Sequence, residues 1–99
     1  MFEVFVTREY DLWLSGLRDV VGRARISDRV DRLLVSGHWG DHKVLVGGII
    51  DLRTDVGPGY RLYCKRIGRA TVLFLVGGDK ASQRRDIERA KELAKRWQA

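Results

Sequence analysis

The chain has 99 residues, of which 44% are hydrophobic and 32% are charged, and its formal net charge is +6. This length suits one domain with its own core and excludes two, and the composition is that of an ordinary globular protein rather than a disordered one. We expect a single domain over residues 1–99.

The cysteine content and the apolar runs bear on the cellular compartment. Cys64 is the only cysteine, so an intramolecular disulfide is excluded and secretion is not favoured. The N-terminal residues lack the basic and long apolar segments of a signal peptide. The longest apolar run, ATVLFLV, is about a third of a membrane span. We therefore expect a cytoplasmic protein that does not enter a membrane.

The positive charge is confined to the C-terminal part of the chain. Residues 1–60 carry 8 Lys or Arg against 9 Asp or Glu, a net charge of −1, whereas residues 61–99 carry 11 against 4, a net charge of +7. Such segregation is typical of proteins that bind a nucleic acid or an acidic protein. The alternative is a solvated basic surface without a specific partner.

The first part of the chain predicts one strand and two helices. Residues 2–6 are rich in β-branched and aromatic side chains and predict a strand. Thr7 is a good N-cap for a first helix, which Gly16 weakens and ends. A second helix is expected over residues 19–35, with Gly37 as its C-cap. Its apolar stripe is expected to comprise Ile26, Val30, Leu33 and Leu34, extended by Val20, Val21 and Ala24.

Three strands are predicted after a loop that holds His38, His42 and Lys43. They are IIDLRT (49–54), YRLYCKR (60–66) and ATVLFLV (70–76). Their connections are short and contain glycine, which predicts an antiparallel meander. The third strand is apolar on both faces and suits the centre of a sheet.

A final helix closes the chain. Asp79 can cap it, and its apolar stripe is formed by Ile87, Ala90, Ala94 and Trp97. The predicted fold class is therefore α+β, a small antiparallel β-sheet packed against helices in the order β-α-α-β-β-β-α.

Cations gather on one face of the hairpin formed by residues 49–54 and 60–66. Because side chains alternate along a strand, the core-facing set, which includes Cys64, leaves a second set facing solvent. That second set comprises Arg53, Arg61, Tyr63 and Lys65.

Two further cations are expected near the rim of this face, Lys80 and Arg84. Arginine binds phosphate bidentately, and tyrosine offers a ring on which a base can stack. Single-stranded RNA requires that combination of a protein surface. The alternative is a wet sheet face whose charges discourage edge pairing.

Other chemistries are less well supported. His38 and His42 lie in a glycine-bounded loop without a cysteine nearby, which disfavours a metal site. Cys64 faces the core and is interpreted as a packing residue rather than a nucleophile. The glycine pairs at 47–48 and 77–78 lack the P-loop pattern. We therefore expect neither a metal nor a cofactor.

Long stretches of the chain resemble a known family. DLRTDVGPGYRLYCKRIG, VLFLVGGDKASQRRDIERAKELAKRW and the upstream pair of helices are similar to the RelE/ParE superfamily of bacterial toxins, above all to its HigB-like branch of addiction module killer proteins. The resemblance covers nearly the whole chain, and GPGYR with GGDKASQRRDIERA is its specific part. It implies a toxin domain built on a compact antiparallel sheet, and a cognate antitoxin, often of the helix-turn-helix type.

Members of this superfamily differ in function. RelE-type toxins are metal-free ribonucleases that cut mRNA on the ribosome, whereas ParE-type toxins bind and poison DNA gyrase. The resemblance therefore implies a type II toxin whose partners are the ribosome and mRNA, or alternatively a non-enzymatic toxin with a protein target such as gyrase. A third interpretation is a degenerate member that only binds its antitoxin and DNA in a repressor complex.

The resemblance transfers some site residues and not others. The family's hairpin arginines correspond to Arg53 and Arg61, and Lys80 can replace the arginine that follows the last strand. The family's two strand lysines and its C-terminal tyrosine are missing, since these positions hold Ile49, Asp51 and Ile87. We accordingly assign the catalytic roles to Arg61, Lys80, Tyr63 and Lys65, and RNA binding to Arg53, Arg66 and Arg84.

Within this assignment, Arg61 and Lys80 would stabilise charge on the phosphate. Tyr63 or Lys65, or else His42, would transfer a proton, since surrounding cations would lower the pKa of either residue toward that of a base. Arg61→Ala is expected to remove toxicity without unfolding the protein, because an exposed arginine contributes little to stability.

Overall fold

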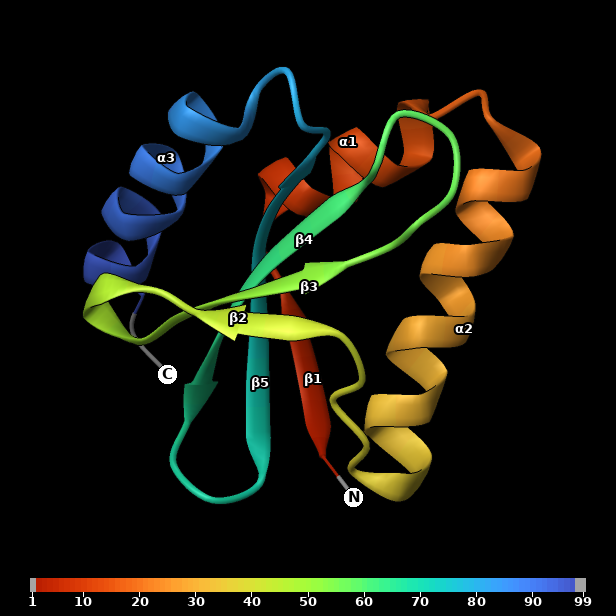
Figure 1. Cartoon of the computed structure of the whole chain (residues 1–99). Helices are drawn as coiled ribbons and strands as arrows, with labels where there is room; N and C mark the ends of the chain where they lie inside the picture. Colours follow the sequence, from red (N-terminus) through yellow and green to blue (C-terminus); the bar gives the residue numbers. More distant parts are fainter. Residues whose placement is uncertain (1, 98–99) are drawn as a thin grey trace.

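Five strands form one mixed sheet between helices in the computed structural model, which describes residues 2–97. In chain order the elements are β1 (Glu3–Val6), α1 (Arg8–Gly16), α2 (Val20–Ser36), β2 (His42–Val44), a 3₁₀ turn (Val46–Gly48), β3 (Ile49–Arg53), β4 (Arg61–Ile67), β5 (Thr71–Gly78) and α3 (Gln83–Arg96). Figure 1 shows α2 and α3 on opposite sides of the sheet. The α+β class is confirmed.

The strands are arranged in the order β1-β5-β4-β3-β2. β2 to β5 pair with their neighbours in antiparallel fashion, which confirms the predicted meander of the last three strands. β1, however, runs parallel to β5, so the prediction of a wholly antiparallel sheet is wrong. Two helices and three strands separate β1 from β5, and a connection of that length permits parallel pairing. β5 therefore lies inside the sheet, as its apolar sequence predicted.

The short strand β2 replaces part of the predicted loop. His42 pairs with Leu52 and Lys43 with Asp51 on β3. Three residues between glycine-containing segments are too few for a recognisable alternation of apolar and polar side chains. The order of elements is thus β-α-α-β-β-β-β-α, with one strand more than predicted.

The ends of α1 and α2 are those that the sequence predicted. The predicted cap of the last helix is wrong, because α3 begins at Gln83 with Ser82 as its N-cap, and Asp79 Oδ1 instead accepts the N–H groups of Ala81 and Ser82 in the turn before the helix. The hydroxyl oxygen of Thr7 accepts the Tyr10 N–H at 3.0 Å, and a carboxylate oxygen of Asp19 accepts the Gly22 N–H at 2.9 Å. Gly37 ends α2 in the left-handed conformation. Within residues 2–97 no helix has both the length and the apolar character needed to cross a membrane.

The apolar stripe of α2 is narrower than expected. Its buried residues are Gly22, Ile26 and Leu33. Val20 and Val21 are 75% and 60% exposed and Ala24 is exposed too, so the predicted extension of the stripe through these three residues is wrong. They do not lie on the side of α2 that carries its buried residues.

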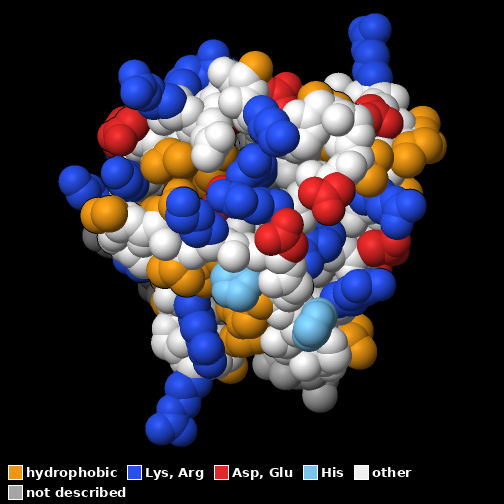
Figure 2. All heavy atoms as spheres, in the orientation of Figure 1, with side chains coloured by type: hydrophobic (Ala, Val, Ile, Leu, Met, Phe, Trp, Pro, Cys, Tyr) orange, Lys and Arg blue, Asp and Glu red, His pale blue; other side chains and the backbone are white. Residues whose placement is uncertain are grey.

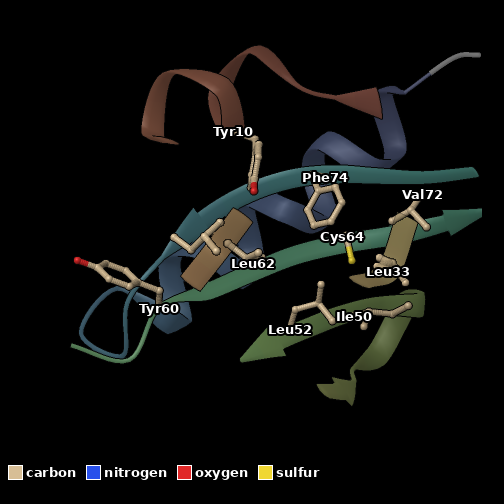
Figure 3. Packing of buried hydrophobic residues seen from close by; sticks show 10 residues of the cluster. Tyr10, Leu33, Ile50, Leu52, Tyr60, Leu62, Cys64, Val72 and Phe74 are labelled. Atoms are coloured by element: carbon tan, nitrogen blue, oxygen red, sulfur yellow. The ribbon is translucent and has the colours of Figure 1, made fainter. Parts of the chain in front are cut away.

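The sheet has a core on each of its faces. Side chains from α1 and α2 pack with one face, where Cys64 is fully buried as predicted, and Figure 3 shows this cluster. Side chains from α3 cover the other face, with Ala90 at its centre. The second face is therefore not the solvent-facing surface that the alternation predicted. The residues buried beneath α3 are Ile49, Tyr63, Leu73, Leu75 and Val76.

Candidate functional site

Three of the predicted cations line one hollow at the end of the β3–β4 hairpin. Arg53 ends β3, Arg61 begins β4, and the two are paired in the sheet register. Lys80 follows β5, and its side chain lies along the loop between the hairpin strands. The hollow has a volume of about 460 Å³, and we call it the cationic hollow. Its lining residues are Asp41, Arg53, Thr54, Asp55, Gly57, Pro58, Gly59, Arg61 and Lys80.

A buried carboxylate holds two of these cations in place. Asp51 is 0% exposed, and its Oδ2 accepts hydrogen bonds from Arg61 Nη1 at 3.1 Å and from Arg53 Nε at 3.4 Å. Within the described part of the chain, Asp51 Oδ1 has no hydrogen-bond partner. One carboxylate thus neutralises part of the charge of two guanidinium groups and fixes their orientation.

Arg61 is not the exposed strand residue that the sequence predicted. It is 8% exposed, on the face of the sheet that packs against α3, and it is paired with the fully buried Asp51. Removing Arg61 would leave the Asp51 carboxylate buried with only Arg53 beside it. The expectation that Arg61→Ala spares the fold therefore rested on the wrong exposure.

Tyr63 is also placed differently from the prediction. It is 0% exposed in the core beneath α3, so its ring offers no face to a base. Burial, reinforced by the nearby Asp51 charge, raises the pKa of the Tyr63 hydroxyl, whereas the prediction was a lowered pKa. The hydroxyl stays protonated at neutral pH and cannot act as a base there.

The other predicted site residues lie apart from the cationic hollow. Lys65 lines a separate hollow of about 340 Å³ with Lys91 and Lys95 of α3. Arg66 is exposed, donates from Nη2 to the Arg69 carbonyl at 2.9 Å, and lies 5.1 Å from the centre of the Phe2 ring. Arg84 is exposed on α3 and lines a third hollow that also includes Lys80. Of these residues, Arg84 is connected to the cationic hollow through Lys80.

One cation beside the site was missed by the sequence analysis. Lys43 on β2 pairs directly with Asp51 on β3, so both side chains lie on the same face of the sheet. Lys43 is exposed at the edge of this sheet. Placing Lys43 next to Asp51 from the sequence would have required recognising residues 42–44 as a strand that pairs with β3.

Figure 2 shows Lys and Arg side chains gathered over the middle of one face, with acidic side chains beside them toward α2. The acids that line the cationic hollow, Asp41 and Asp55, are both exposed. Lys80 is exposed too. The hollow therefore combines anchored arginines with an exposed lysine, a donor set that suits a phosphate.

The histidines and the cysteine contribute no metal site. His38 and His42 are exposed, and His42 Nδ1 is within 2.8 Å of the Gly40 carbonyl oxygen. Burial raises the pKa of the Cys64 thiol, which keeps it protonated. Among residues 2–97 no three His, Cys, Asp or Glu side chains come together in a group that could hold a metal ion.

Comparison with known proteins places the chain beside a bacterial relative. An uncharacterized protein of Haemophilus influenzae is 42% identical over 92 residues, which are 93% of this chain and 92% of the relative. The chain belongs to the same family as that protein. The match spans nearly all of both chains, so the similarity is not confined to a shared motif. No family model and no solved structure matches the chain.

Proposed function

We propose that this protein is a type II toxin of the RelE/ParE superfamily that inhibits translation by cutting mRNA on the ribosome, without a metal or cofactor. The observation that supports the proposal best is the convergence of Arg53, Arg61 and Lys80 on one hollow. The proposal places the protein in the cytoplasm, with mRNA and the ribosome as targets. A cognate antitoxin, of the helix-turn-helix type, would cover its basic surface.

The chemistry assigned to the site is transesterification of RNA. The 2′-hydroxyl passes its proton to water and attacks the adjacent phosphorus, the bond from phosphorus to the 5′-oxygen breaks, and that oxygen takes a proton from a lysine side chain. The products are a 2′,3′-cyclic phosphate and a 5′-hydroxyl. Arg53 and Arg61 would hold the phosphate and stabilise the charge that develops on it. Their fixed orientation on Asp51 means that little reorganisation is needed during the reaction.

Proton transfer would be carried out by lysine rather than tyrosine. Tyr63 is buried and Lys65 lines a different hollow, so neither is placed for this role. Lys80 at the rim of the hollow is the first candidate to protonate the leaving oxygen, and Lys43 beside Asp51 is the second.

A different class of function is favoured by the burial of Tyr63. The burial of Tyr63 removes one candidate for proton transfer. A non-enzymatic toxin that binds a protein target such as DNA gyrase requires no residue for proton transfer. The two functions differ in whether the message is cut.

Primer extension on a translated message, with purified protein and with or without ribosomes, tests the proposal. We expect wild type to cut within codons only when ribosomes are present. Lys80→Gln should cut about 10²-fold more slowly, the cost of losing one transition-state contact. Tyr63→Phe serves as the matched control and should cut like wild type, because its hydroxyl lies outside the hollow.

An intact message at doses that stop growth would contradict the nuclease proposal. Inhibition of gyrase supercoiling by the same preparation would then establish the alternative. Slow cutting by Tyr63→Phe, with an unchanged melting temperature, would restore Tyr63 to the site and show that the assignment to Lys80 is incomplete.

A further inference from the structure

A second hollow adjoins the cationic hollow, between α2 and the loop that joins β3 to β4. Its volume is about 250 Å³, and we call it the α2 groove. Asp41, Arg53, Thr54 and Asp55 line both hollows, so the two form one continuous depression. The remaining lining residues of the α2 groove are Arg25, Asp28, Arg29, Arg32 and Val56.

Three arginines follow one face of α2 along this groove. Arg25 and Arg29 are four residues apart and Arg32 follows after three more, a spacing that places them side by side on a helix. Arg25 and Arg32 are exposed. Among residues 2–97 no carboxylate oxygen lies within 4.0 Å of either guanidinium group, so both can accept an external anion.

Arg29, the middle arginine, is anchored rather than free. Its Nη2 donates a hydrogen bond to the Asp41 carbonyl at 2.5 Å, and a Cβ added at Gly40 would lie 1.8 Å from its Nη1. The absence of a side chain at Gly40 therefore makes room for the Arg29 guanidinium. Arg29 Nε is buried and has no partner among the described residues. The groove is thus lined by one anchored cation, Arg29, with two exposed cations beside it on α2.

We infer that the α2 groove binds a backbone phosphate of the RNA strand whose cleaved phosphate occupies the cationic hollow. The inference rests on the proposed function. Six cations and three acids line the combined depression, and arginine matches phosphate geometry bidentately. No aromatic side chain of the described residues lines either hollow, so the groove contacts the backbone and tolerates any base.

An acidic segment of a protein partner is the competing occupant. Such a segment gains most of its affinity from apolar contacts at the centre of its interface. The α2 groove offers Val56 as its one aliphatic lining residue in the described part of the chain, which favours RNA over a peptide.

Binding of two labelled RNAs by fluorescence anisotropy tests the inference. One RNA is a trinucleotide, which we expect to occupy only the cationic hollow, and the other has about 12 nucleotides. Arg25→Gln with Arg32→Gln should weaken binding of the long RNA about tenfold, lower its salt dependence by about two phosphate contacts, and leave trinucleotide binding unchanged. Arg23→Gln with Arg69→Gln removes the same charge from exposed positions outside both hollows and should bind both RNAs like wild type.

The inference would be overturned if the groove variant, with Arg25→Gln and Arg32→Gln, bound the long RNA as tightly as the control variant, with Arg23→Gln and Arg69→Gln. A groove variant that keeps its RNA affinity but loses affinity for a polyglutamate peptide would also overturn it, in favour of a protein partner. Lys80 lines the cationic hollow and not the α2 groove. The Lys80→Gln variant therefore distinguishes a failure of the inference about the groove from a failure of the proposed function. If Lys80→Gln cuts a translated message like wild type, the proposed site fails, whatever the groove variants do.

Discussion

The Asp51–Arg61 pair is the residue-scale feature on which the candidate site depends. Both side chains are buried, and Arg53 donates to the same carboxylate oxygen. A buried ion pair adds little net stability compared with apolar side chains, yet it is costly to break, because the remaining charge has lost its water. The pair therefore fixes the position of the arginines more than it stabilises the fold.

A double-mutant cycle on this pair has a definite expected result. Asp51→Asn should lower the free energy of unfolding by about 3–5 kcal/mol, since it leaves Arg61 buried without a counter-charge. Arg61→Gln should cost less, because Arg53 still pairs with Asp51. In the variant that carries both changes, the loss in the free energy of unfolding, measured by urea unfolding, should be smaller than the sum of the two single losses. Additive losses would show that the two charges are independent.

The alternation of side chains along β3 and β4 predicted correctly which face of the sheet each residue lies on, but it did not predict how exposed each residue is. It correctly placed Arg53, Arg61 and Tyr63 on the face opposite Cys64. It could not show that α3 covers that face, because alternation within one strand carries no information about a helix that is distant in the chain. The stripe at Ile87 and Ala90 was the available signal, since it needs a surface on which to pack.

Among the elements, β5 allows α1 to approach its backbone closely, because it carries a glycine at the point of contact. A Cβ added at Gly77 would lie 2.2 Å from ring carbons of Trp13, so α1 packs directly on the β5 backbone. The glycine pair at 77–78, which ends β5, thus has a packing role. The short β2 was missed for a related reason, because three residues give no periodicity from which to predict a strand.

Alanine at Gly77 and at Gly16 should have opposite effects. Gly77→Ala should lower the free energy of unfolding by about 1–3 kcal/mol, because the Trp13 ring must move. Gly16→Ala, at the end of α1 with no atom within 4 Å of the added Cβ, should raise it by up to about 1 kcal/mol. Thermal unfolding followed by circular dichroism compares them. A neutral Gly77→Ala would mean that α1 is free to shift on β5.

In the whole molecule, the basic residues of the segment 61–99 lie on more than one surface and do not form a single basic patch. Lys65 lies with Lys91 and Lys95, whereas Arg61 and Lys80 lie at the end of the hairpin. The sequence predicted which residues are cationic, and their grouping required the sheet order and the position of α3. The arginines of α2, in the part of the chain without a net positive charge, complete the depression that the proposed function uses.

The chemical nature of the RNA ends at the cut site tests whether the protein cleaves mRNA through attack by the 2′-hydroxyl. The message is translated with the wild-type protein, and the fragments are examined for a 2′,3′-cyclic phosphate and a 5′-hydroxyl. A parallel message carries a 2′-O-methyl group at the cut nucleotide. We expect these two ends and no cut at the methylated position, because attack requires the 2′-hydroxyl. Fragments with a 5′-phosphate, or cutting that persists at the methylated position, would contradict it.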